Sequence, residues 1–177
     1  PADPLTWTVA AGSGQITPGF KVVQIKPFRD ELFVFGLNSI KKIVPDATSS
    51  FILQDVTNNL GCIASDSVLE VAGSLVFLSP DGIRPIAGTM KNNDVELDLL
   101  SEDIQYLVQQ YVEGNNLEYL NGVVVPSKTQ FRYLFSSPGG VQSVSKGIIG
   151  CYSVNRDDKG WEFGELLGIR ASSTWSG

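Results

Sequence analysis

Histidine is absent from this sequence, which removes the residue that enzymes most often use as a general base and proteins most often use as a zinc ligand. Cysteine occurs only at Cys62 and Cys151, which are far apart and in no CxxC spacing. We expect both to be small buried apolar residues, because nothing in the composition argues for an oxidising compartment and a disulfide.

Long apolar runs are also lacking. No run approaches the length of a membrane-spanning helix, so no transmembrane segment is expected. No basic stretch followed by an apolar core opens the chain, so nothing indicates a secretory signal peptide. The sequence begins with Pro1 instead of methionine, and we interpret it as a segment of a longer subunit.

Basic residues are few and scattered. The chain has 13 Lys and Arg against 19 Asp and Glu, a formal net charge of −6, and Lys41-Lys42 is the only adjacent basic pair. A nucleic-acid-binding surface needs clustered basic side chains that displace counterions from phosphates, so such a surface is disfavoured. An acidic surface is compatible with a channel through which DNA slides without sticking.

What remains is ordinary globular material. The 177 residues are 42% hydrophobic and 18% charged, which is enough for one well-buried domain. Gly at 18 and Pro at 9 suit a chain with many turns.

Two stretches, residues 30–43 and 73–86, align with each other without a gap. The identical pairs are Leu32/Leu75, Ile40/Ile83 and Ile43/Ile86. Each copy is an apolar run, a polar turn and a second short strand, and the spacing falls within the roughly 40–50 residues that one blade of a β-propeller needs. We therefore expect a mainly β fold of repeated antiparallel sheets that resembles a β-propeller.

Further strands are predicted where apolar or alternating runs are bounded by turn residues. Beside the two copies, these runs are 20–25, 51–56, 68–71, 117–120, 123–125, 131–135, 148–154 and 161–167. A hairpin is expected across Ala72-Gly73-Ser74, and another across the polar residues 155–160.

Residues 101–113 have a different pattern, and they contain the one helix that we predict. Ser101 is a good N-cap, and acidic residues occupy the first turn, where the helix dipole favours them. The apolar positions Ile104, Leu107, Val108 and Tyr111 follow helical spacing, and Gly114 is placed to end the helix. The run 131–135 aligns with 75–78 if this helix is inserted between two blades. We expect Leu107→Asp to damage folding or assembly.

Acidic residues provide no convincing catalytic or metal-binding pattern. Asp157 and Asp158 lack the alternate acidic ligands and distal Glu of a calcium loop, so we expect a solvated hairpin tip. Asp81 fits a turn. Glu162 and Glu165, three apart on one strand, would face opposite sides of the sheet, so they would not form the carboxylate pair of a glycosidase.

Glycine-rich and aromatic residues are interpreted structurally as well. Residues 12–14 and 136–140 lack the lysine and the strand–loop–helix context of a phosphate loop. We interpret Tyr106, Tyr111, Trp161 and Trp175 as core or interface residues, not as stacking platforms for sugars or bases. No catalytic, cofactor-binding or metal-binding residue is predicted, no cofactor is expected, and the protein is not expected to be an enzyme.

Several short motifs resemble tail proteins of short-tailed phages. They are DPLTW at 3–7, DELFVF at 30–35 with NSI at 38–40, GCIA at 61–64, LVFLSPDGIR at 75–84, and CYSV with KGW within 151–161. The family they resemble is the tail nozzle, or tail tubular protein B, together with the packaged-DNA stabilisation proteins of the head-to-tail connection. The resemblance covers most of the chain.

This resemblance implies a structural virion component in the tail, assembled in the host cytoplasm. It implies a ring of copies, hexameric by resemblance, that continues the DNA channel below the portal and contacts adaptor or portal-proximal and tail proteins. DNA would pass without specific binding, and no membrane would be involved. Family members are much longer than this chain, so residues 1–177 are expected to be a single β-propeller-type region of a longer subunit. The family carries no reaction, so no catalytic residue is transferred.

Two alternatives from other classes remain open. A carbohydrate-binding propeller or lectin-like module, used in receptor recognition, would place exposed Trp and Tyr beside Asp or Asn, and would bind a glycan array. An enzymatic propeller such as a glycosidase would turn over a glycan, although no credible acid pair is present.

Overall fold

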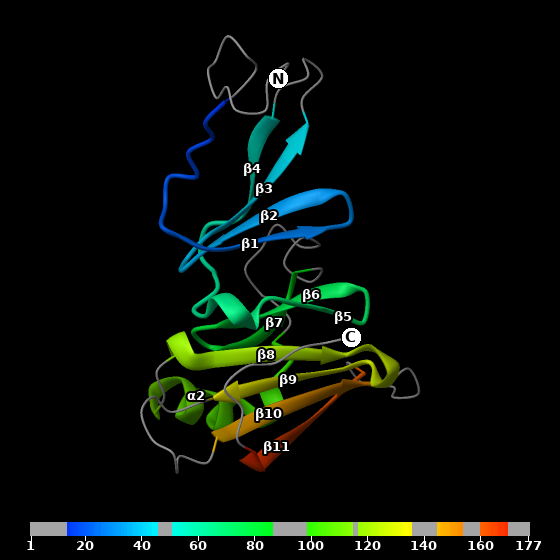
Figure 1. The fold of residues 1–177 in the computed structure, drawn as a ribbon. Coiled ribbons are helices and arrows are strands. Elements are labelled where there is room, and N and C mark those ends of the chain that lie inside the picture. The colour runs from blue at the N-terminus through cyan, green and yellow to red at the C-terminus, as the bar shows by residue number, and fades with distance from the viewer. Residues whose placement is uncertain are drawn as a thin grey trace.

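The computed structural model describes residues 14–45, 51–86, 99–114, 117–135, 145–153 and 160–169 of the chain. Over these residues the fold is mainly β, with three antiparallel sheets and one α-helix (Figure 1). In each sheet the strands follow one another in chain order, so each sheet is a simple meander. The prediction of repeated antiparallel sheets is therefore confirmed.

Sheet A contains β1 (Val22–Phe28), β2 (Glu31–Gly36), β3 (Ile40–Pro45) and β4 (Phe51–Thr57). Arg29 and Asp30, which both have a positive φ, form the tight two-residue turn between β1 and β2. The expected polar turn after β2 is also present, because the backbone N–H of Gly36 donates to the carbonyl oxygen of Ser39 at 2.8 Å.

Sheet B is the three-stranded sheet β5 (Leu69–Val71), β6 (Ser74–Ser79) and β7 (Gly82–Pro85), preceded by the short 3-10 helix η2 (Ser65–Ser67). Ala72 (φ 51°) and Gly73 (φ 70°) turn the chain between β5 and β6, which confirms the predicted hairpin there. The outer edge of β7 is also occupied. The N–H of Leu100 donates to the carbonyl oxygen of Ile83 at 2.9 Å.

Sheet C contains β8 (Leu120–Val125), β9 (Gln130–Phe135), β10 (Ser145–Tyr152) and β11 (Trp161–Ile169). A 3-10 helix, η5 (Pro126–Lys128), links β8 to β9. The pairing of β10 with β11 confirms the last predicted hairpin, although residues 154–159 of its tip lie outside the described residues. One strand prediction was wrong: residues 117–119 form the 3-10 helix η4 (Leu117–Tyr119), and the strand begins only at Leu120.

The three sheets stack face to face, with sheet B in the middle (Figure 1). Successive side chains of a strand point to opposite faces, and β6 is buried on both. Leu75 and Phe77 pack into a core shared with sheet A, which we call the A–B core. Val76 and Leu78 pack into a core shared with sheet C, the B–C core. A middle sheet with two buried faces explains why residues 75–78 read as one continuous apolar run.

Sheet A contributes Phe33, Phe35 and Ile40 to the A–B core, where the rings of Phe35 and Phe77 lie 5.5 Å apart. Sheet C contributes five large side chains to the B–C core, namely Leu120, Phe131, Tyr133, Phe135 and Ile148. Full burial of one such side chain is worth about 1.5–3 kcal/mol, so these two cores are the main stabilising contacts between the sheets.

The predicted helix lies between sheets B and C in the chain. It consists of a 3-10 turn, η3 (Glu102–Ile104), and α2 (Gln105–Gly114). The helix follows β7 and precedes β8, so it lies within the longer spacing between β6 and β9. All four predicted apolar positions of the helix contact the B–C core, but to different extents. Val108 and Tyr111 are buried in this core, whereas Ile104 and Leu107 are half-buried against it.

Ser101 does not cap this helix with its side chain, which corrects the N-cap prediction. Its hydroxyl oxygen instead accepts the backbone N–H of Ile83 at 3.0 Å. Ser101 is fully buried beside β7, where an unpaired N–H of Ile83 would be costly, so this bond takes precedence over helix capping.

Candidate functional site

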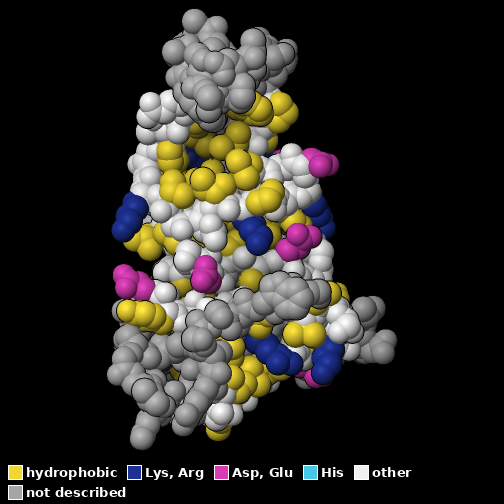
Figure 2. Space-filling model, in the orientation of Figure 1, with side chains coloured by type: hydrophobic (Ala, Val, Ile, Leu, Met, Phe, Trp, Pro, Cys, Tyr) yellow, Lys and Arg dark blue, Asp and Glu magenta, His cyan; other side chains and the backbone are white. Residues whose placement is uncertain are grey.

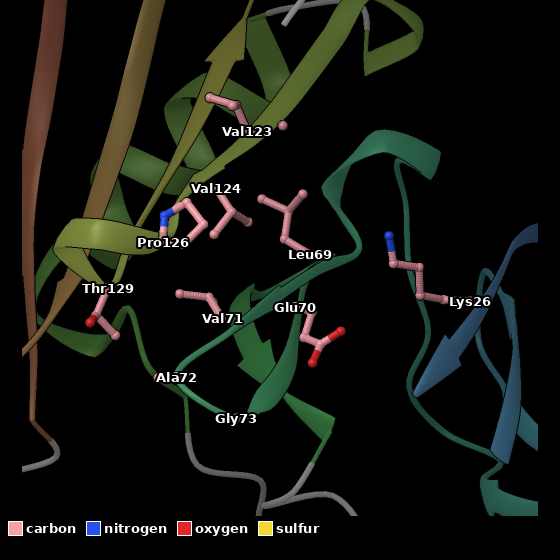
Figure 3. A pocket seen from close by; sticks show the side chains of 11 residues that line it. Lys26, Leu69, Glu70, Val71, Ala72, Gly73, Val123, Val124, Pro126 and Thr129 are labelled. Carbon is pink, nitrogen blue, oxygen red and sulfur yellow. The ribbon is translucent and has the colours of Figure 1, made fainter. Parts of the chain in front are cut away.

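A cavity lies where the first strands of the three meanders come together. It is a groove of about 590 Å³ between β1, β5 and β8 (Figure 3). Lys26 reaches it from β1, while Leu69, Glu70 and Val71 come from β5. Gly122 to Val124 of β8, with Pro126 and Thr129, form the facing wall. Each contributing strand is the first strand, and therefore an edge strand, of its sheet. The groove therefore runs along the side of the stack where the three first strands lie.

Polar contacts tie the sheets together along this side. Gln24 donates through Nε2 to the carbonyl oxygen of Ser65 at 3.2 Å, and Arg29 donates through Nη2 to that of Gly73 at 2.5 Å. These two bonds fix sheet A onto η2 and onto the β5–β6 turn. A side chain at Gly122 would place its Cβ 2.1 Å from the carbonyl oxygen of Asp66, so glycine allows β8 to approach η2 closely.

A buried polar cluster lies beneath η2, between the two cores. Ser67 donates through its hydroxyl to the carbonyl oxygen of Ala64 at 2.7 Å and accepts the N–H of Leu78 at 3.1 Å. Tyr133 donates through its hydroxyl to the carbonyl oxygen of Ser67 at 2.6 Å, across from sheet C. Burial raises the pKa of Tyr133, so the phenol stays protonated and serves as a fixed donor.

Cys62 belongs to the same cluster. Its Sγ lies 3.0 Å from the carbonyl oxygen of Ala64 and 3.3 Å from the hydroxyl of Ser67. Burial raises the pKa of the Cys62 thiol, which makes it a poor nucleophile. The prediction of a buried Cys62 is confirmed. Cys151 is only half-buried, and its Sγ accepts a hydrogen bond from Nε2 of Gln130 at 2.7 Å. Both cysteines are free.

The chemistry available in the groove is limited. Lys26 and Glu70 supply its charges, Thr129 its hydroxyl, and valine, leucine and proline most of the remaining wall. Within the described ranges, no cluster of three or more His, Cys, Asp or Glu residues is placed to hold a metal ion. Lys26 and Glu70 therefore give the groove one basic and one acidic side chain on an otherwise largely apolar wall.

The two carboxylates of β11, Glu165 and Glu162, have structural neighbours on opposite faces of sheet C. Glu165 lies opposite Ile148 of the B–C core and accepts a hydrogen bond from the hydroxyl of Tyr111. Burial, together with the neighbouring Glu165, raises the pKa of Tyr111. Glu162 lies opposite Cys151, and the odd spacing places it on the other face, as predicted.

Asp81 is the turn residue that the sequence indicates, but it has a second contact that was not predicted. Arg84, which is nearly buried, donates through Nε to Asp81 Oδ1 at 3.0 Å and through Nη2 to Oδ2. Partial burial alone would raise the pKa of Asp81, but the hydrogen bonds from Arg84 and Ser79 outweigh it and lower this pKa. The Asp–x–x–Arg spacing in the turn was the available signal.

The aromatic candidates separate into buried and exposed residues. Tyr111 stacks on Phe135 with ring centroids 5.0 Å apart, as a core residue should. Trp161 is half-buried and contacts the rings of Phe131, Tyr152 and Phe163. Tyr106 is 80% exposed on α2, so it is not a core residue.

Several candidates lie outside the described residues. They are Asp157, Asp158, Trp175, the segment 136–140 and residues 12–13. None of the helices that the structure describes is long and apolar enough to cross a membrane. A scan against protein-family models finds no match for this chain, and a search of curated proteins finds no significant match.

Proposed function

We propose that this chain is a structural module of a phage tail, part of a ring-forming nozzle or connector subunit that continues the DNA channel below the portal. The observation that carries the proposal is the stack of three meanders whose first strands lie on one side. Two of the motifs that resemble nozzle proteins fall within this stack. DELFVF at 30–35 forms most of β2 and the residue before it. LVFLSPDGIR at 75–84 forms most of β6, the turn after it and most of β7.

A propeller-like arrangement is part of this proposal. In a propeller, meander sheets pack face to face around an axis, and the first strand of each blade lines the central channel. Sheets A, B and C pack face to face, and β1, β5 and β8 share the groove, which supports this part of the proposal. The stack would therefore form an arc of blades, with the groove facing the axis.

The module would act by shape. The groove carries one lysine and one glutamate, so it has no net positive charge to hold phosphates. The chain as a whole is acidic, which repels DNA over distances of about 10 Å at moderate ionic strength. A channel wall of this kind guides the genome without binding it.

Location is tested by immunogold electron microscopy of phage particles with antibodies against this chain. Label on a ring at the base of the head or in the tail is expected. Particles that carry the chain on a fibre or not at all would contradict the proposal, and binding of the chain to a glycan array would favour the carbohydrate-binding alternative.

The conduit role is tested by Glu70→Lys. If the groove faces passing DNA, the added positive charge should retain phosphates and slow genome ejection in vitro, most strongly at low salt. Glu113→Lys makes the same charge change on the exposed side of α2 and serves as the matched control. Equal ejection rates for Glu70→Lys and wild type would remove the conduit claim.

A further inference from the structure

Equivalent residues of the two aligned copies, 30–43 in sheet A and 73–86 in sheet B, point in the same direction along the stack of sheets. Leu75 and Ile86 of sheet B point toward sheet A, into the A–B core. Their counterparts in the aligned copy, Leu32 and Ile43, lie on the face of sheet A that points away from sheet B, because they pair with each other and alternate with the core residue Phe33. Corresponding faces of sheets A and B therefore point the same way along the stack.

The same direction continues into sheet C. Phe131 and Tyr133, which align with Leu75 and Phe77, point toward sheet B. Each sheet thus has a receiving face, which accepts the preceding sheet, and a covering face, which packs on the next one. Within this chain the sheets use these faces in the order A, B, C, which leaves one receiving face and one covering face at the two ends.

The outer face of sheet A is the receiving face without a partner among the described strands and helices (Figure 1). Phe20 covers its end at Gly36. Elsewhere Phe51 is 64% and Ile25 48% exposed, although exposed sheet faces are ordinarily polar. Figure 2 shows hydrophobic side chains gathered over this part of the molecule. The apolar side chains of the face that remain partly or largely exposed are Val22, Ile25, Leu32, Ile43, Phe51 and Leu53, whereas Val34 on the same face is buried, with 3% of its surface exposed.

The outer face of sheet C is the covering face without a partner among the strands and helices that the structure describes. Its partly exposed apolar side chains are Val123, Val125, Ile149 and Leu166, whereas Leu134 on the same face is buried, with 5% of its surface exposed. It also carries one basic and one acidic residue, Arg132 and Glu162, and the outer face of sheet A likewise carries Lys41 and Asp55. Since both faces are apolar with balanced charge, stacking one on the other would bury no net charge.

We propose that the outer face of sheet A receives the outer face of sheet C from a second copy of this chain. The contact joins two different surfaces, so it is head-to-tail, and repetition gives a ring if the rotation per copy closes. The inference deepens the proposed assembly role and rests on it. A symmetric pairing of two sheet A faces is disfavoured, because it would join two receiving faces, which occurs nowhere in the stack.

The expected affinity follows from the size of the faces. Four strands about 4.8 Å apart and roughly six residues long, at about 3.3 Å per residue, cover roughly 400 Å². Both partners together would bury somewhat more than 800 Å², which is below the size of most stable complexes. Isolated copies should therefore associate weakly and reversibly, with a mass that rises with concentration.

The test is a concentration series by sedimentation equilibrium, with two variants that each block one face. Ile25→Lys blocks the receiving face and Ile149→Lys the covering face, and lysine keeps its charge in solvent while its stem lies on apolar surface. Each variant alone should associate at least about tenfold more weakly than wild type. An equimolar mixture should recover association but stop at two chains, since each complex has one intact junction.

Tyr106→Lys, on the exposed side of α2, is the matched control and should associate like wild type. Thermal unfolding of each variant confirms that it is folded, and Val125→Lys replaces Ile149→Lys if the latter is not. A wild-type chain that stays monomeric at every concentration, or a mixture that stays monomeric like its components, would overturn the proposal. Either result concerns this junction alone, because the tail location is tested separately by immunogold labelling.

Discussion

At the scale of single residues, the fold depends on side chains that connect distant parts of the chain. Tyr133 reaches the carbonyl oxygen of Ser67 across 66 positions of sequence, and Ser67 in turn holds the backbone of β6. Each of these groups is buried, so leaving one unpaired would cost about 1–3 kcal/mol. Asp81 and Arg84 act more locally, because they close the turn between β6 and β7.

Asp81→Asn should destabilise the protein in a pH-dependent way. The pKa of Asp81 is lowered in the folded state, so its contribution is complete above the unfolded pKa of about 3.9 and is lost as the pH falls through the folded pKa. The carboxylate is 41% exposed, so we expect a loss of only about 1 kcal/mol at pH 7. Urea unfolding at pH 7 and near pH 2 measures this.

Asp30→Asn, in the tight β1–β2 turn, is the control, because no ion pair to Asp30 occurs among the described residues. It should unfold like wild type at both pH values. If the deficit of Asp81→Asn remained unchanged in acid, the ion pair with Arg84 would not be its source.

At the scale of elements, α2 packs on the stack through a narrow face. Val108 is 1% exposed within the B–C core, whereas Leu107 is half-buried and Tyr106 lies in solvent. These three consecutive residues therefore sample the full range of burial on one helix. The gradient allows the packing of the helix to be tested without changing its position in the chain.

Val108→Asp should lower the free energy of unfolding by about 3 kcal/mol or more, because it places a carboxylate without a partner in the B–C core. Leu107→Asp should cost about half as much, and Tyr106→Asp less than about 0.5 kcal/mol. Thermal unfolding followed by circular dichroism ranks the three variants. Equal melting temperatures would show that α2 does not pack through this face.

Sequence patterns predict the elements well and their interactions less well. Strands such as β2 and β6 are bounded by turn residues and have strong apolar runs, so local chemistry is enough to find them. The cap at Ser101 could not be predicted correctly, because its hydroxyl serves an N–H that is 18 residues away. Leu117–Tyr119 has a strand-like composition, but forms a 3-10 turn.

The groove could not be predicted from the sequence either. Its walls come from three strands that no local pattern brings together, and Lys26 and Glu70 have no motif around them. The repeat of residues 30–43 in 73–86 did contain the needed information, because it fixes which way each sheet faces. The packing of Leu75 against sheet A gives this direction, and the sequence repeat alone does not.

At the scale of the whole molecule, the stack has two different apolar ends and a groove along one side. Such a body is suited to repetition, because each copy can continue the stack of the copy before it. In our account the ends join neighbouring copies and the groove faces the axis of the ring. The account assigns no reaction to any residue.

Cryo-electron microscopy of the assembled phage particle tests this account most directly. We predict a ring in which β1, β5 and β8 face the axis and sheet A of one copy packs on sheet C of the next. A map in which these strands belong to a continuous barrel, or in which the outer face of sheet A points into solvent, would contradict it.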